Sequence, residues 1–181
     1  MNDSGEVRLS GKLVRLRPFR AEELAAVRSG RGEPGHKGEL SARERANWLD
    51  VVHAQGAFVD ERMDLAIDAD DRLIGGIEVR RCDKAMPPGV YELGIALFQE
   101  SSRRRGFGSE AIALLAHFLF DRHDAGRVQV STAITNNGMR RSLDKSGFRD
   151  EGTLRAYMPG PDGREDYEMY SLTRPEWDES R

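Results

Sequence analysis

A glycine-containing loop between a strand and a long helix most constrains how this chain can fold. Val90–Leu97 has the pattern of a strand, 103–108 is a basic loop with two glycines, and Ser109–Arg122 has the apolar spacing of a helix. An alternating strand follows at Val128–Ile134. This order of strand, helix and strand favours parallel pairing of the two strands. The sequence therefore predicts an α/β (α+β) fold.

The segments around this unit predict mainly antiparallel strands. Asp70 and Asp71 give a turn signal between two short alternating segments, and Ser41 with Glu44 forms a capping box. The expected strands span 13–17, 64–67, 73–79, 90–97, 128–134, 148–154 and 166–172, and the expected helices span 21–28, 41–53, 109–122 and 137–145. We expect one domain, residues 1–181, with a central mixed, mostly antiparallel sheet of about six to seven strands flanked by about four helices.

The composition argues against several classes of protein. A net charge of -3 at pH 7 disfavours a bulk basic surface for nucleic acid or anionic membrane. Cys82 is the only cysteine, which excludes an intramolecular disulfide and a cysteine zinc site. Met1–Ser10 lacks the apolar region of a signal peptide, and no apolar run approaches the roughly 18 residues of a membrane span. We expect a cytoplasmic protein without metal, nucleic-acid or membrane partners.

The basic loop has the chemistry of a phosphate site. The first N–H groups of a helix lack acceptors inside the helix, and the helix dipole adds positive potential there. Gly106 and Gly108 allow close approach of the main chain to an anion, and Arg103, Arg104 and Arg105 add charge. A plain turn with a solvated basic edge is the alternative interpretation. No Gly-Lys-Ser/Thr follows and a third glycine is missing, which argues against a P-loop and a dinucleotide fingerprint.

Four segments of the chain resemble the GNAT acyltransferase family. Arg103-x-x-Gly106-x-Gly108 matches its Gln/Arg-x-x-Gly-x-Gly/Ala motif, and 136–148 is similar to its Asn-x-Ala-Ser-x-x-x-x-Glu-Lys-x-Gly-Phe block. The start, 9–24, and the end, 167–172, look like the RimJ/RimL-like branch. The resemblance covers nearly the whole chain. It implies a bacterial, acetyl-CoA-dependent N-acetyltransferase that uses no metal.

The resemblance also implies where acetyl-CoA lies. In that family the loop amides hold the pyrophosphate, and the preceding strand splays from its neighbour to receive the pantetheine arm. The expected contacts on this chain are Ala96, Leu97, Phe98, Arg103, Arg104, Arg105, Gly106, Phe107, Gly108, Ser109 and Asn136. The chain departs from the family pattern at a junction, 98–102, that is one residue longer. It departs again at Met139, which replaces a serine, and at Leu143, which replaces a proton-donating tyrosine of other branches.

Direct acetyl transfer needs a neutral amine and a group that accepts its proton. Glu92 lies on the strand that leads into the loop, where many relatives place a working carboxylate. If Leu93 and Ile95 face one side of this strand, Glu92 faces the other. A structural ion pair is the alternative interpretation of Glu92. Tyr170 is a candidate proton donor, although a packed tyrosine with a satisfied hydroxyl is the more common finding.

The sequence leaves the acceptor open between a protein N-terminal α-amine and a small-molecule amine. By resemblance, the region from about Gly30 to Glu61 covers the acceptor cleft, and it includes Glu33, Glu39, Trp48 and Asp50. An acidic lining would favour a cationic amine, and a solvated face is the alternative interpretation of these residues. Many relatives are dimers, so a homodimer is one assembly that the resemblance suggests. The replaced serine and tyrosine motivate an alternative function, a catalytically weak acyl-CoA-binding or protein-interaction module of the same fold.

Overall fold

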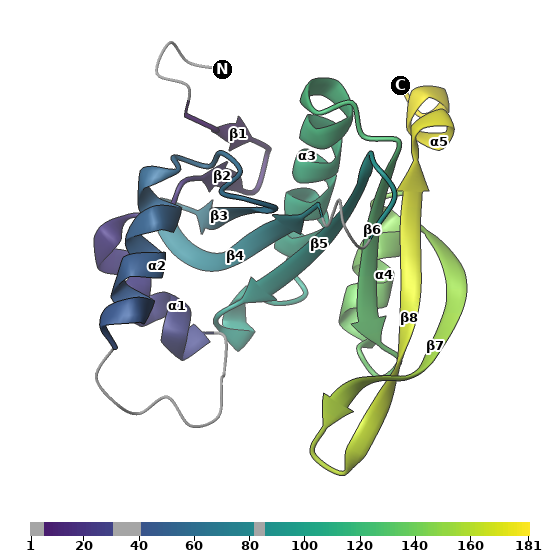
Figure 1. The fold of residues 1–181 in the computed structure, drawn as a ribbon. Coiled ribbons are helices and arrows are strands. Elements are labelled where there is room, and N and C mark those ends of the chain that lie inside the picture. Colours follow the sequence, from purple (N-terminus) through teal and green to yellow (C-terminus); the bar gives the residue numbers. More distant parts are fainter. Residues whose placement is uncertain (1–5, 31–40, 82–85) are drawn as a thin grey trace.

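A mixed sheet forms the centre of the computed structural model, which describes residues 6–30, 41–81 and 86–181 (Figure 1). In this part of the chain the sheet has eight strands in the order β1-β2-β3-β4-β5-β6-β8-β7. All neighbouring strands are antiparallel except β5 and β6, which are parallel. The strands are β1 Leu9–Ser10, β2 Arg15–Arg17, β3 Arg62–Ala69, β4 Arg72–Arg80, β5 Val90–Leu97, β6 Arg127–Ala133, β7 Arg149–Gly160 and β8 Gly163–Thr173. The α-helices are α1 Leu24–Gly30, α2 Ala42–His53, α3 Phe107–Arg122, α4 Asn137–Lys145 and α5 Arg174–Glu179, and the 3-10 helices are η1 Ala21–Glu23 and η2 Glu100–Ser102.

Helices cover both faces of the sheet (Figure 1). On one face Trp48 of α2 and Ala66 of β3 belong to a small apolar cluster to which α1 also contributes. On the other face α3 packs its fully buried Ile112, Leu115 and Leu119 into the main core. The two faces follow from the alternation of side chains along each strand. A side chain's position in its strand therefore decides which set of helices it meets.

Most predicted elements are confirmed. β5 and α4 have the predicted bounds, and β3, β4 and β5 form the predicted antiparallel meander. Asp70 and Asp71 form the turn between β3 and β4, and both have positive φ, 50° and 58°. The capping box of Ser41 and Glu44 starts α2 as predicted. The predicted loop at 30–38 falls largely outside the described residues.

The strand count is slightly higher than predicted because of the ends of the sheet. β1 has only two residues, which is too short for an alternating pattern to be visible in sequence. β7 and β8 have 12 and 11 residues and form a long hairpin, whereas the sequence predicted strands that stop at 154 and resume at 166. Cross-strand pairing extends both strands through residues whose composition is typical of a turn.

The start of α3 differs from the prediction, and α5 is an additional helix beyond the four that the sequence predicts. α3 begins at Phe107, two residues before the predicted Ser109, because Gly106 with φ of 85° serves as its N-cap. α5 follows a capping box formed by Thr173 and Glu176, with proline in its first turn. This second start signal is present in the sequence.

A buried arginine ties the helices on the first face to the sheet. Arg17 of β2 is 5% exposed. Its guanidinium donates two hydrogen bonds to Asp68 of β3, two to Glu23 of η1 and one to the carbonyl oxygen of Pro18, so all five N–H groups are used. Burial by itself raises the pKa of Glu23, but the Arg17 hydrogen bonds and the N–H of Arg20 lower it below its ordinary value. The pairing favours the ionised form of the Glu23 carboxyl group inside the protein.

Arg17→Leu is expected to lower the free energy of unfolding by about 3–5 kcal/mol, because it leaves two buried carboxylates without their partner. Urea unfolding at neutral pH measures this change. Arg8→Leu is the control, since Arg8 pairs with Glu6 at the surface and its removal should cost less than about 1 kcal/mol. Equal effects of the two substitutions would contradict the structural role of Arg17.

Candidate active site

The pairing between β5 and β6 stops partway along the strands. Their register includes Val90 with Arg127, Tyr91 with Val128, and Glu92 with Gln129. From Leu93 to Leu97, β5 pairs with β4 alone, while β6 pairs with β8 as far as Ala133. Figure 1 shows the two strands diverging from this point. An open edge of main-chain groups on each strand therefore faces the other, as the splayed arrangement predicts.

The predicted phosphate loop lies at the open end of this strand pair. Gly106 and Arg104 both adopt positive φ, 85° and 60°, as the chain turns into α3. The three arginines Arg103, Arg104 and Arg105 are exposed, and none of them forms an ion pair within the described part of the chain. The Arg105 guanidinium lies 4.7 Å from the centre of the Phe107 ring. Free arginines beside a helix start provide the positive potential that phosphate needs.

An acid in the first turn of α3 is engaged by the turn between β1 and β2. The carboxylate of Glu110 accepts hydrogen bonds from the main-chain N–H groups of Lys12, Leu13 and Val14 at 2.9, 2.7 and 2.7 Å. Its charge is thereby compensated by the turn between β1 and β2. The sequence gives no sign of this contact, which joins positions about a hundred residues apart.

The other expected cofactor residues lie near the same end of the sheet. Because β5 and β6 are parallel, the main chain of Ala96, Leu97 and Phe98 and the turn after β6 approach the open end together. Asn136 in that turn is exposed, and its side-chain oxygen accepts the N–H of Met139, which caps α4. The hydroxyl of Ser146 at the end of α4 donates to the carbonyl oxygen of Ser109, 3.0 Å away. Phe107 and Gly108 form the first turn of α3.

Glu92 is the last residue of β5 that pairs with β6. Arg80 donates to its Oε1 at 3.2 Å, and the Gln129 amide donates to its Oε2 at 3.0 Å. Its side chain is 15% exposed. Gly94 and Ala96 follow on the same face of β5, and the Glu78 side chain of β4 lies over Gly94. The carboxylate is engaged in an ion pair and stands where the two strands separate.

A row of polar contacts crosses the sheet through Glu92. On the β3 side, Arg62 pairs with Asp64 at 2.6 Å and with Glu78 at 2.7 Å, and Arg80 lies 3.6 Å from Glu78. On the β6 side, Arg127 donates to Gln129 and to Glu151, and Ser171 donates to Glu151 at 2.7 Å. These partners come from different strands, so sequence reasoning could not find them without the register.

Tyr170 occupies the opposite face of the sheet from Glu92. It pairs with Val130, one residue beyond Gln129, and is 2% exposed. Its hydroxyl donates to Glu168 at 3.2 Å and accepts from Arg140 of α4 at 3.4 Å. Burial raises the pKa of Tyr170. The contacts match the interpretation of Tyr170 as a packed residue with a satisfied hydroxyl.

Two of the three departures from the family pattern, Met139 and Leu143, have structural roles in α4. Leu143 is fully buried in the main core, and Met139 packs against that core from the helix surface. Neither side chain has a group that donates a proton. The junction at 98–102, which the sequence marks as one residue longer than the family pattern, contains η2 and the buried Ser102.

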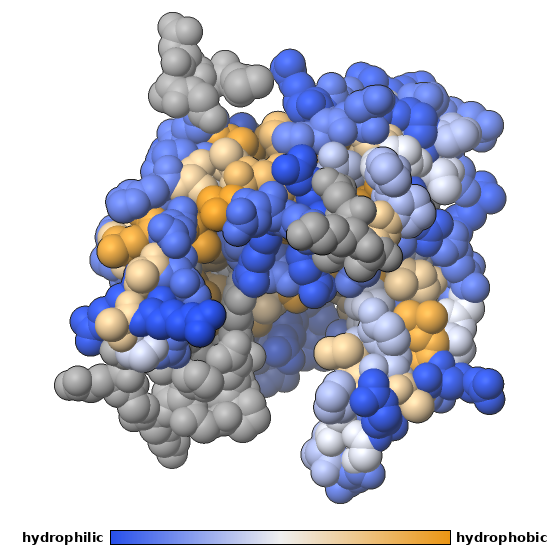
Figure 2. Space-filling model, viewed as in Figure 1, coloured by the Kyte–Doolittle hydropathy of each residue, from blue (hydrophilic) through white to orange (hydrophobic). Residues whose placement is uncertain are grey.

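The face that carries Glu92 is hollowed. Figure 2 shows an opening between the body of the protein and the β7–β8 hairpin, in the region where β5 and β6 separate. Trp48 and Asp50 line a separate cavity on the same side. Glu33 and Glu39, which were expected near the acceptor cleft, lie outside the described residues.

Within residues 6–30, 41–81 and 86–181, no group of three or more histidine, cysteine or acidic side chains is arranged to hold a metal ion. No helix in the same segments is long and apolar enough to cross a membrane.

The fold and the loop define a mixed α/β protein that presents a helix start with exposed arginines beside an opened pair of parallel strands. Residues 14–149 match the family described as the Acetyltransferase (GNAT) domain. The match spans most of the chain, which therefore belongs to the GNAT acetyltransferase family.

Named relatives agree with this assignment. The chain is 29% identical over 119 residues to the SPbeta prophage-derived uncharacterized N-acetyltransferase YokL of Bacillus subtilis (strain 168), a match that spans 66% of each chain. A putative acetyltransferase from T. thermophilus is 28% identical, with a TM-score of 0.68, over 99% of this chain and 95% of that one. Mycobacterium smegmatis RimJ in complex with CoA-disulfide has the same fold, with a TM-score of 0.71 at 20% identity over 95% of this chain and 87% of that one.

Glu151 in the polar row has a depressed pKa that makes its contribution to stability depend on pH. Hydrogen bonding to Arg127 lowers the pKa of Glu151 from 4.5 to about 2. A carboxylate with a lower pKa in the folded state stabilises the fold above pH 4.5, and the effect is lost as the pH falls toward 2.

Glu151→Gln is therefore expected to destabilise the protein near pH 7 and to be almost neutral near pH 2. Because the Glu151 side chain is 40% exposed, the loss at neutral pH should stay below about 1 kcal/mol. Urea unfolding across this pH range measures the difference. A difference that is constant with pH would show that the Arg127 pairing does not control this carboxyl group.

Proposed function

We propose that this protein transfers an acetyl group from acetyl-CoA directly to a primary amine. The observation that carries the proposal is the end of β5–β6 pairing at Glu92 and Gln129, beside a helix start with unpaired arginines. The pyrophosphate would bind the N–H groups at 106–109 and the charges of Arg103, Arg104 and Arg105. The pantetheine arm would extend along the open edge of Ala96 and Leu97 toward Glu92.

Glu92 is the proposed base. The amine nitrogen attacks the thioester carbonyl carbon, a tetrahedral intermediate forms, and the carbon–sulfur bond breaks to release the CoA thiolate. The amine proton passes to the Glu92 carboxylate, directly or through one water, and finally to the thiolate through solvent. Arg80 and Gln129 fix the carboxylate at the point of separation. Main-chain N–H groups on the open edge of β5 are the proposed donors to the oxyanion.

No side chain is assigned as general acid in this proposal. The Tyr170 hydroxyl is engaged by Arg140 and Glu168 on the other face of the sheet. Leu143 has no side-chain group that can donate a proton. The thiolate of CoA is a good leaving group, so acetyl transfer to a neutral amine does not require protonation as the carbon–sulfur bond breaks.

The acceptor is proposed to be a protein N-terminal α-amine, as the likeness to the RimJ/RimL-like branch suggests, or a small-molecule amine. We further propose that the enzyme works in the cytoplasm, with a homodimer as one assembly to test. The alternative function, an acyl-CoA-binding or protein-interaction module, is favoured by the ion pair that engages Glu92 with Arg80. Retained acetyl-CoA binding without turnover on any amine would support that alternative.

Gly106→Glu is expected to abolish acetyl-CoA binding, because a side chain at this position blocks the approach of the pyrophosphate to the main-chain N–H groups and its charge repels the pyrophosphate. Titration calorimetry measures the dissociation constant. Gly89→Glu is the matched control, since Gly89 has a similar φ of 78° but lies at the opposite end of β5. Tight binding by Gly106→Glu, or equal loss in Gly89→Glu, would argue against the loop as the cofactor site.

Glu92→Gln is expected to lower kcat by about 10²–10⁴-fold, the usual contribution of a general base, while the affinity for acetyl-CoA changes little. The rate of thiol release with an excess of amine measures kcat. Glu151→Gln is the control because Glu151 belongs to the same row of polar contacts but bonds to Arg127 and Ser171 rather than to Glu92. Similar losses of kcat in both variants would assign the effect to the row of polar contacts as a whole and would reject Glu92 as the base.

A further inference from the structure

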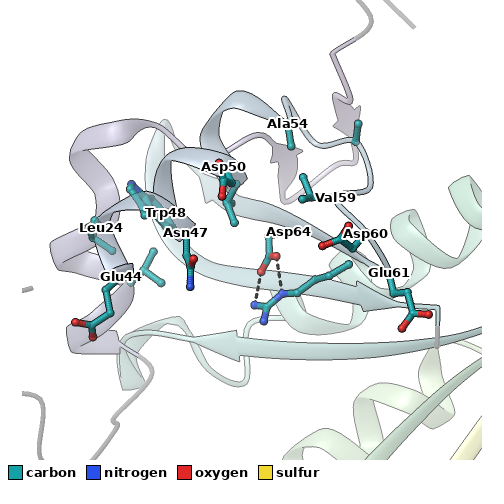
Figure 3. Close-up of a pocket in the computed structure, with 14 residues that line it drawn as sticks. Leu24, Glu44, Asn47, Trp48, Asp50, Ala54, Val59, Asp60, Glu61 and Asp64 are labelled. Carbon is teal, nitrogen blue, oxygen red and sulfur yellow. Dashed lines mark hydrogen bonds and ion pairs between the residues drawn. The ribbon is translucent and has the colours of Figure 1, made fainter. Parts of the chain in front are cut away.

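A cavity of about 580 Å³ lies between α2 and the start of β3, on the face of the sheet that carries Glu92 (Figure 3). This size falls within the range of small-molecule sites. One part of its wall is apolar and is formed by Leu24, Val27, Trp48, Val51 and Val59. Such a wall fits a chain of methylene groups.

The rest of the wall is acidic. It carries five carboxylates and one guanidinium, from Glu44, Asp50, Asp60, Glu61, Asp64 and Arg62. Two of the acids are engaged, since Asp64 pairs with Arg62 and Glu44 accepts hydrogen bonds from Ser41. Among the residues that the structure describes, the other three, Asp50, Asp60 and Glu61, form no ion pair. The cavity therefore keeps a negative potential that suits a cationic ligand.

The cavity is aligned with the proposed base. Arg62 at its edge stands opposite Arg80 in the strand register, and Arg80 stands opposite Glu92, so the three residues point to the same face of β3, β4 and β5. Two strand spacings separate Arg62 from Glu92, which corresponds to roughly 10 Å. A ligand that is held beyond the Arg62 edge of the cavity must span at least about this distance to place its other end at Glu92.

We propose that the cavity binds the distal ammonium groups of a linear polyamine whose opposite primary amine is acetylated at Glu92. The proposal rests on the transfer reaction described above and narrows its acceptor to a small polycation. Asp50, Asp60 and Glu61 hold the positive end, and the apolar wall packs against the methylene groups. An alkylamine with a single charge would bind only at Glu92, and contacts in the cavity would not increase its affinity.

The test compares butylamine, 1,4-diaminobutane and spermidine as acceptors, with thiol release giving kcat/KM and calorimetry giving spermidine binding. The pocket variant combines Asp50→Asn, Asp60→Asn and Glu61→Gln. Asp60 has φ of 53°, which asparagine tolerates, and the other two changes preserve shape. The control variant, Asp124→Asn with Asp178→Asn and Glu179→Gln, removes three exposed charges around α5.

Wild type is expected to prefer spermidine over butylamine by at least about tenfold in kcat/KM, because each exposed charge pair contributes a factor of a few. The pocket variant should lose most of this preference and its spermidine binding. On butylamine, the pocket variant should keep the wild-type rate within about twofold, and it should keep its affinity for acetyl-CoA. The control variant should keep the wild-type rates on all three amines within about twofold.

Equal use of the three amines, or a preference for spermidine that survives in the pocket variant, would overturn the proposal while leaving acetyl transfer intact. Spermidine binding that the pocket variant loses, in a protein that acetylates no amine, would instead keep the cation site and reject the transfer reaction.

Discussion

The short parallel pairing of β5 with β6 is the constraint on which the proposed site depends. Parallel strands need a crossover, and α3 with the loop before it provides this connection. Pairing begins at Val90 with Arg127 and ends at Glu92 with Gln129. Because antiparallel neighbours hold each strand on its far side, the two can separate without loss of the sheet. The loop, the open edges and the carboxylate all take their positions from this junction.

The sheet also separates two chemical environments. The face with Glu92 carries ion pairs that run from strand to strand, and the face with Tyr170 carries the main core together with α3 and α4. The opening between β5 and β6 is the place where the two faces meet. In the proposed reaction, acetyl-CoA enters along this opening and the acceptor reaches it from the acidic side. Arg17 fastens the helices of that side to the sheet.

Local signals in the sequence predicted elements well and predicted contacts poorly. The helix from Asn137 to Lys145 and the strand from Val90 to Leu97 have clear limits in glycine, proline and periodicity, and both were predicted with the observed bounds. The loop that starts α3 was identifiable by its glycines and arginines. The partners of Glu92 were not, because Arg80 and Gln129 reach it only through the registers of three strands. The long β7–β8 hairpin likewise depends on cross-strand pairing that turn-like composition conceals.

The contact of Glu110 with the N-terminal turn links two regions that would otherwise open independently. When the turn at Lys12, Leu13 and Val14 is in place, three amides neutralise a carboxylate within the first turn of α3. If that turn opens by local unfolding, the Glu110 carboxylate loses these three donors, and its charge then lowers the positive potential at the proposed phosphate site. Order in the turn at Lys12, Leu13 and Val14 and the proposed anion affinity about a hundred residues later would thus be coupled through one carboxylate.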